Sequence, residues 1–448
     1  MELLEGKRVG TSSPETVSTK QQRIATLAKS EKRELTTLAH HIDVDWLKEA
    51  FRRTRKDGAP GIDGVTAQEY GQRLEENLQL LLNRAKSGEY RAPAVRRVFI
   101  PKGDGRQVRP IGVPTFEDKL LQRAVQMVLE PIYEQEFHDC SYGFRPGRSA
   151  HQALASLRNQ LMEMGGGWLV EVDIKSFFDT LDHQHLQQLI RRRVRDGVLL
   201  RLIGKWLNAG VQHAGDFSRP DAGTPQGGVI SPLLANIYLH EVLDEWVEQE
   251  VKPRLDGRCF LVRYADDFVM GFSSEADARR VLDVLPKRFG KYGLTLHPEK
   301  TRLLRFERPR NTDGHQPPSE SFDFLGFTHH WAKSLRSWWV IKQRTAPSRF
   351  SRALKKVAAW CRAFRHRPVA EQLRHLSAAL RGHYGYFGLT GNSHALYRFA
   401  WEVQTVWHKW LARRSQRGMS WARFAELLER FPLPRPSRLT PAARAANP

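Results

Sequence analysis

Cysteine is scarce in this chain of 448 residues: there are three, Cys140, Cys259 and Cys361. They are too few for a disulfide framework and too widely spaced for a CxxC zinc motif. Long apolar runs are also missing, since none approaches the ~18 residues that span a bilayer. The N-terminal stretch has no hydrophobic block behind its charges, as a secretion signal would. We therefore expect a cytoplasmic protein with no membrane partner. The sequence gives no indication of its oligomeric state.

Acidic residues are depleted in the last quarter of the chain. The net charge is +22, and from Trp331 onward there are 23 Lys and Arg against 4 Asp and Glu, together with 8 of the 12 Trp. The preceding residues are nearly neutral. A basic, aromatic module attached to a neutral body is typical of polyanion binding, with nucleic acid as the expected partner. The alternative is a basic surface that keeps the protein soluble, but such charge should be spread over the whole chain.

The apolar fraction of 40% is sufficient for a sizeable core. The clearest helical face lies in residues 117–137, and the stretch 95–114 predicts a cation-rich hairpin. Residues 168–174 (WLVEVDI) form a short apolar run that predicts a buried strand. Residues 258–272 predict two strands around a turn at Ala265-Asp266. After Trp338-Trp339 the pattern is all helical, with three amphipathic segments and a shorter fourth.

Three carboxylates occupy unusual positions in this pattern. Asp173 ends an apolar strand, and Asp266 and Asp267 lie between two apolar runs. Asp is depleted in strands and costly to bury unpaired. If the three came together, divalent cations would be needed to neutralise them, and oxygen ligands favour Mg²⁺. Two such ions support phosphoryl transfer. Taken alone, Asp266-Asp267 could equally be an ordinary hairpin turn.

An ordered series of motifs resembles the reverse transcriptases encoded by bacterial group II introns. The series is VDIKSFFDTLDH, GTPQGGVISPLLANIYLHEVLDEW, RYADDFVMGF, LHPEKTRLLRF and FDFLGF, with SYGFRPGRSAHQAL upstream and LRGHYGYFGLTGNSHALYRF downstream. It covers about Gly58 to Leu433. YADD alone would be weak evidence, whereas the full series in this order is very specific.

The resemblance implies an α+β right-hand polymerase with helical fingers, a palm built on an antiparallel sheet, and a three-helix thumb. The domain boundaries that we expect are an N-terminal extension at 1–45, fingers at 46–165, a palm at 166–332 with a fingers insert around 182–220, a thumb or maturase domain at 333–435, and a tail at 436–448. Many relatives carry a further HNH endonuclease with paired CxxC motifs, which we do not expect here.

The resemblance also assigns roles to single residues. Asp173, Asp266 and Asp267 would be the catalytic, metal-binding triad for two Mg²⁺ ions, with the carbonyl of Ile174 completing one metal shell. Phe178 would lie under the sugar of the incoming nucleotide and exclude a 2′-OH, whereas one of Phe177 and Phe178 is expected simply to fill the core.

The other residues assigned by resemblance lie around the nucleotide. Arg96 and Lys102 would bind the triphosphate, and Arg109 could do so or hold its loop. Gln226 would line the nucleotide pocket, unless TPQGG is a plain turn. Lys300 would protonate the pyrophosphate, unless it is a solvated strand-edge lysine.

The basic C-terminal region would hold the template–primer duplex. The cluster of Arg413, Arg414 and Arg417 is the expected RNA contact. For Trp401, Trp407 and Trp410 core packing is favoured over base stacking.

The implied function is RNA-directed DNA synthesis from dNTPs on intron RNA, primed by a DNA primer or target DNA, together with maturase activity in splicing. Two alternatives stay open: a related reverse transcriptase of a phage-defence or CRISPR-associated system, and an RNA-binding splicing cofactor without polymerase activity. The intact aspartates disfavour the second.

Overall fold

The computed structural model describes residues 16–31, 33–102, 107–213, 216–218, 227–309 and 320–436. At 102, 107, 213 and 216–218 the description is of the backbone alone. The described part contains α-helices and mainly antiparallel sheets, in agreement with the α+β class.

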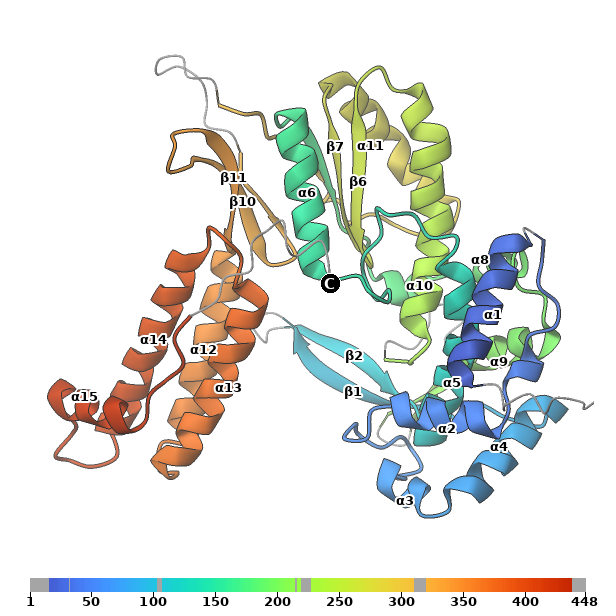
Figure 1. Cartoon of the computed structure of the whole chain (residues 1–448), viewed down its shortest axis with the longest axis horizontal. Coiled ribbons are helices and arrows are strands. Elements are labelled where there is room, and N and C mark those ends of the chain that lie inside the picture. Colours follow the sequence, from blue (N-terminus) through green and yellow to red (C-terminus); the bar gives the residue numbers. More distant parts are fainter. Residues whose placement is uncertain are drawn as a thin grey trace, which may run out of the picture.

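Helices dominate the N-terminal region, on the right of Figure 1. They are α1 (Val17–Ser30), α2 (Val44–Arg53), α3 (Ala67–Gly71), α4 (Leu74–Ser87) and α5 (Phe116–Tyr133), with a 3₁₀ turn, η1 (Ala39–His41). Helix α5 is the predicted helix within 117–137, and Thr115 caps its start by accepting a hydrogen bond from the Asp118 N–H. Its apolar face is buried under α1 and α2, where the Trp46 indole N–H donates to the Ala124 carbonyl at 2.9 Å.

A hairpin of β1 (Val95–Lys102) and β2 (Gln107–Val113) extends from this region toward the C-terminal helices (Figure 1). It is the cation-rich hairpin that the sequence predicts. Strand β1 also pairs, in parallel, with β4 (Val211–His213), and β4 pairs with β5 (Asp216–Ser218). The resulting sheet has the order β2-β1-β4-β5.

The central sheet has the order β6-β7-β3-β8 and is antiparallel throughout. Its strands are β3 (Trp168–Val172), β6 (Cys259–Tyr264), β7 (Asp267–Phe272) and β8 (Arg302–Arg305). One face packs on α11 (Glu275–Gly290) and α10 (Ser231–Leu239), within the core shared with the N-terminal helices. The other face packs on α6 (Ala150–Met164).

Short helices connect β3 to α10: α7 (Phe177–Thr180), α8 (His183–Arg191) and α9 (Gly197–Leu207). Helix α10 continues into two π-helical stretches, η2 (His240–Glu245) and η3 (Val247–Val251), and ends in a 3₁₀ turn, η4 (Lys252–Arg254).

A third sheet corrects one sequence prediction. Strands β9 (Phe322–Phe324), β10 (Phe327–Lys333) and β11 (Trp339–Thr345) pair in the order β11-β10-β9. The prediction that the chain is all helical after Trp339 is therefore wrong for β11. Its buried positions alternate, but two of them are polar: Gln343 donates to the Leu154 carbonyl, and the Thr345 N–H donates to Asn392. The sequence of β11 therefore lacks the alternation of apolar and polar residues by which a strand is recognised. The hairpin also runs across the boundary expected at 332–333.

The C-terminal helices have a hydrophobic core of their own. They are α12 (Pro347–Ala363), α13 (Val369–Phe387), α14 (Ser393–Ala412) and α15 (Trp421–Arg430), on the left of Figure 1. Trp407 is fully buried and Trp410 packs against the core, as predicted, but Trp401 is 60% exposed. Six residues along an α-helix turn the side chain by ~600°, so Trp401 and Trp407 lie ~120° apart and do not share a face.

Candidate active site

Strand pairing brings the predicted aspartates together. Strands β3 and β7 are antiparallel, with Val172 opposite Phe268, so that Asp173 and Asp267 lie one step further along the same register. Asp266 occupies the turn between β6 and β7, directly after Ala265, whose φ is +57°. A two-strand register and one tight turn therefore place all three carboxylates at one end of the central sheet.

The three carboxylates affect each other's ionisation. Burial raises the pKa of Asp266, and the charge of Asp173 raises it further. Asp267 keeps some contact with solvent, but removal of its carboxylate from bulk water raises its pKa to about 6, with additional contributions from Asp266 and Asp173. Ionised carboxylates so close together repel each other, and this repulsion is what a bound cation would relieve. The site therefore fits an oxygen-ligated divalent metal ion.

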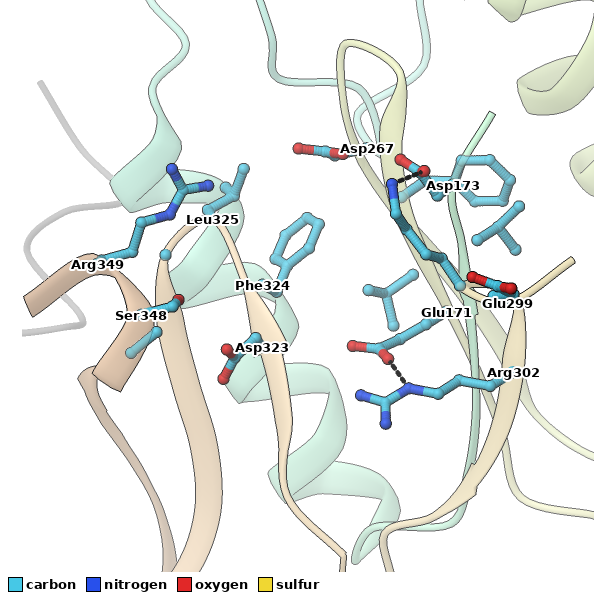
Figure 2. Close-up of a pocket in the computed structure, with 16 residues that line it drawn as sticks. Glu171, Asp173, Asp267, Glu299, Arg302, Asp323, Phe324, Leu325, Ser348 and Arg349 are labelled. Carbon is cyan, nitrogen blue, oxygen red and sulfur yellow. Dashed lines mark hydrogen bonds and ion pairs between the residues drawn. The ribbon is translucent and has the colours of Figure 1, made fainter. Parts of the chain in front are cut away.

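A cavity of about 420 Å³ opens beside these carboxylates. Asp173 and Asp267 line one wall, and the turn at Leu325-Gly326 and the start of α12 line the other (Figure 2). Arg349 lies across the cavity from Asp267, and its positive charge partly offsets the rise in the pKa of that carboxyl. Sequence reasoning missed Arg349, which carries no motif and comes from a sequence-distant helix.

Lysine and arginine side chains already pair with two of the acidic groups. The Lys300 ammonium donates to Asp173 Oδ2 at 2.6 Å, and Arg302 donates to Glu171 at 2.5 Å. The predicted Lys300 is thus in the site, and its side chain is 54% exposed. Lys300 therefore has a defined partner, Asp173, and is not a strand-edge lysine that contacts solvent alone.

A buried polar cluster supports the turn at Ala265-Asp266 and was also missed by the sequence reasoning. Arg263, in β6, binds Asp244 through two hydrogen bonds of 2.8 and 2.5 Å, and both side chains are fully buried. The same guanidinium donates to the carbonyl of Ala265 at 3.1 Å and to Asn236 at 2.9 Å. The Arg263 guanidinium therefore fixes the backbone of Ala265, the residue before Asp266.

Gly143 allows a second segment to pass against this turn. A Cβ at Gly143 would lie 2.3 Å from the nitrogen of Ala265, so only glycine fits there. The flanking backbone pairs with β6, since the Tyr142 N–H donates to the Arg263 carbonyl at 2.9 Å. The motif SYGFR signals this contact, although sequence alone does not reveal its partner.

Comparison with known proteins identifies the family. Residues 100–329 match the family described as reverse transcriptase (RNA-dependent DNA polymerase). The chain belongs to the reverse transcriptase family. It is accordingly an RNA-directed DNA polymerase, and the right-hand polymerase fold expected from its motifs is the fold of this family. Reverse transcriptases act with divalent metal ions, which agrees with the carboxylate site.

Several relatives are intron proteins. The reverse transcriptase is 38% identical over 322 residues to Protein YkfC of Escherichia coli, covering 63% of this chain and 79% of that protein. It is 47% identical over 183 residues to the group II intron-encoded protein LtrA of Lactococcus lactis, covering 41% of this chain and 30% of LtrA. It is 28% identical over 309 residues to the putative COX1/OXI3 intron 1 protein of Saccharomyces cerevisiae, covering 58% of this chain and 37% of that protein. The resemblance to group II intron reverse transcriptases is confirmed.

The backbone around Ile174 leaves its carbonyl available. In this reverse transcriptase the Lys175 N–H donates to the Thr295 carbonyl and the His297 N–H donates to the Asp173 carbonyl, both at 2.8 Å. Neither bond uses the Ile174 oxygen. Phe177 is buried and Phe178 is only partly buried, with ring centroids 5.3 Å apart. Phe177 therefore belongs to the core, and Phe178 packs against it with part of its surface exposed.

The other predicted nucleotide-binding residues are less fully described. Arg96 donates two hydrogen bonds to the Pro60 carbonyl, at 3.1 and 2.8 Å, which ties the hairpin to the preceding loop. Arg109 is exposed, and its positive charge partly offsets the rise in the pKa of Asp266. Lys102 ends β1, but its side chain is not described, and Gln226 lies outside the described residues.

The predicted RNA-contacting arginines differ from one another. Arg413 and Arg417 are exposed, and the Arg413 guanidinium lies 5.2 Å from the centre of the Trp410 ring. Arg414 instead donates to the carbonyls of Arg365 and Arg367, which joins the turn after α14 to the segment between α12 and α13. The described part of the chain contains no helix that is long and apolar enough to cross a membrane.

Proposed function

We propose that this reverse transcriptase extends a DNA primer on an RNA template with two Mg²⁺ ions held by Asp173, Asp266, Asp267 and the carbonyl of Ile174. When bound, the ions would supply charge stabilisation for in-line phosphoryl transfer. The observation that supports this most directly is the β3–β7 register, which with the turn at Ala265-Asp266 gathers three carboxylates. Burial, and then the charges of the neighbouring carboxylates, raise the pKa values of Asp266 and Asp267.

The remaining residues would position the nucleotide and its leaving group. Lys300, which pairs with Asp173, would turn to the pyrophosphate and donate a proton to it. Phe178 would border the sugar and select dNTPs over rNTPs. Arg96, Lys102 and Arg109, from the hairpin, and Gln226, from the TPQGG motif, would surround the triphosphate.

The polymerase regions follow from this assignment. We place the fingers in the N-terminal helices and hairpin, the palm on the central sheet, and a three-helix thumb in α12–α14. Exposed arginines such as Arg413 and Arg417 would contact RNA phosphates without regard to sequence.

The assay is primer extension on poly-rA with oligo-dT. Asp266→Ala should reduce extension by more than about 100-fold, a loss typical of removing one preorganised electrostatic group, while RNA binding stays unchanged. Glu299→Gln is the matched control, because Glu299 lines the same cavity outside the triad. Extension by Asp266→Ala at the level of the control would contradict the assignment.

The second part of the proposal concerns the RNA. The names of the relatives that are called intron-encoded or intron proteins favour an intron RNA as template, with maturase activity in its splicing, over a defence system. The DNA flanking the gene should then encode a group II ribozyme, and the protein should accelerate its splicing in vitro. Asp266→Ala should splice normally, since splicing would use the RNA-binding surface alone. We place this activity in the cytoplasm, where a bacterial transcript is available.

A further inference from the structure

We propose that His138, His240 and Glu245 form a second metal site, selective for a transition-metal ion such as Zn²⁺ and separate from the catalytic carboxylates. The three residues come from two chain segments, the loop after α5 and the π-helix η2. The proposal does not depend on the proposed polymerase mechanism.

The π-helix creates the alignment of two of these residues. In an α-helix, residues five apart point ~140° away from each other. The wider i→i+5 turn of a π-helix brings them back to nearly the same face, and such turns occur frequently at functional sites. His240 and Glu245 are the first and last residues of η2, exactly five apart. Asp244, one residue earlier, points instead into the core, toward Arg263.

The distances match a tetrahedral metal site. Oε1 of Glu245 lies 3.2 Å from Nε2 of His138 and 3.4 Å from Nε2 of His240. One ligand atom from each of the three residues lies within 4.8 Å of the others. Ligands at ~2.0–2.1 Å from a tetrahedral Zn²⁺ are separated by ~3.3–3.4 Å. A metal ion would therefore need only small side-chain adjustments and would keep its fourth position open to water.

Hydrogen bonding does not explain this arrangement. Charge-assisted bonds between imidazole and carboxylate are ~2.7–2.9 Å long. Within the described residues, the buried Nε2 of His138 has no hydrogen-bond partner of acceptable geometry. Two imidazoles lie 3.2 and 3.4 Å from one carboxylate oxygen, both longer than a charge-assisted hydrogen bond, which fits a shared central ion better than a pair of hydrogen bonds.

The ligand set separates this site from the catalytic one by chemistry. Two imidazole nitrogens and one carboxylate suit Zn²⁺, Co²⁺ or Ni²⁺, whereas Mg²⁺ prefers oxygen ligands alone. Access is open, because the His138 and Glu245 side chains are 29% and 36% exposed. A neighbouring cavity of about 360 Å³ is lined by His240 and Glu245 and gives a route for entry.

A metal here would fasten two segments that support the catalytic turn. His138 lies two residues before Cys140, whose carbonyl accepts a hydrogen bond from the Arg263 N–H at 2.8 Å. On the other segment, Asp244 lies beside Glu245 and binds the Arg263 guanidinium. Nδ1 of His240 also faces Asp244 Oδ2, at 3.8 Å. Occupancy of the site should therefore stiffen the support of Asp266.

The test is a Co²⁺ and Zn²⁺ titration of the full chain, stripped with chelator and kept in millimolar Mg²⁺ to cover the catalytic carboxylates. Wild type should bind one Zn²⁺ and give the visible absorption of tetrahedral Co²⁺. His138→Ala, His240→Ala and Glu245→Gln should each lose affinity by more than the ~10–100-fold that an outer-shell change costs. His366→Ala, an exposed histidine on the C-terminal helices, is the matched control and should bind as wild type does.

A second measurement on the wild type covers variants that fail to fold. Zn²⁺ should protect His138 and His240, but not His366, from acylation by diethyl pyrocarbonate, read by mass spectrometry. Absence of Zn²⁺ binding by the wild type, unchanged binding in the three variants, or equal acylation with and without Zn²⁺ would each overturn the proposal.

Discussion

Arg263 and Asp244 form a buried ion pair next to the turn at Ala265-Asp266. Removing one of the two charges should strongly lower the free energy of unfolding. Asp244→Asn keeps the shape of the side chain but leaves the Arg263 guanidinium, which is 0% exposed, without its counter-charge. Removing one partner of a fully buried pair costs about 3–5 kcal/mol, because the remaining charge stays desolvated. The surface pair Arg279–Glu275 has similar length, 2.6 Å, but exposed fractions of 64% and 41%. Glu275→Gln should therefore cost only about 0.3–0.5 kcal/mol.

A double variant separates stability from positioning. Replacing a buried pair by apolar residues of similar volume is often neutral or stabilising. Asp244→Leu combined with Arg263→Met should thus recover most of the free energy of unfolding lost in the single variant. It would still lack the 3.1 Å bond from Arg263 to the Ala265 carbonyl, so Asp266 would be held less firmly. We expect near-normal stability with a reduced kcat and little change in KM.

The measurements are urea unfolding followed by circular dichroism and steady-state primer extension. A single variant that loses less than about 1 kcal/mol would show that Arg263 is rehydrated when its partner is removed, against its observed burial. A stable double variant with normal kcat would show that the Ala265 bond does not position the turn. Either result would refute the reasoning.

Three further predictions concern single residues. In the proposed metal site Mg²⁺ displaces a proton from Asp267, whose pKa is about 6. The Mg²⁺ concentration for half-maximal extension should therefore rise about tenfold per pH unit below that value, and a flat profile would contradict this. Phe178→Ala should raise rNTP use relative to dNTP use by at least about tenfold in single-nucleotide incorporation; Phe177→Ala, a core change, should lower stability without this switch. Burial raises the pKa of Asp118 from 3.8 to about 8, so the folded state retains a proton that the unfolded state has released, and stability should fall as pH rises across that window. Asp118→Asn should flatten this dependence in urea unfolding at successive pH values.

The clustering of Asp173, Asp266 and Asp267 could be predicted because its signal is local. Asp173 and Asp266-Asp267 each end or interrupt a short apolar run, which is visible without knowledge of the partner strand. Their support could not be predicted in the same way. Arg263 lies within an apolar strand, and Asp244 lies on a helix 19 residues earlier in the chain. Nothing in either segment indicates that the two charges meet in the core.

The other features that the sequence does not predict depend on side-chain directions that depart from a regular helical pattern. A π-helix has the same residue composition as an α-helix, so the alignment of His240 with Glu245 follows from the structure alone. Arg414 and Arg413 read as one basic cluster in sequence, but the first binds backbone carbonyls and the second faces solvent. Both residues lie in the turn after α14, where adjacent side chains point in different directions, and composition does not record which one binds within the protein.

The position of β3 in the central sheet has a consequence for synthesis of the protein. Both of its neighbours, β7 and β8, lie far downstream, beginning at Asp267 and Arg302. At a translation rate of ~5–20 residues per second, the ribosome takes about 5–20 s to produce β7 after β3 has been made. During this interval an apolar strand has two unpaired edges, the feature by which nascent chains associate with each other or with chaperones. Both edges of β3 can be paired only after β8, the last strand of this sheet, has been synthesised. Synthesis of β8 therefore sets the time at which the nascent chain can cover the edges that favour aggregation.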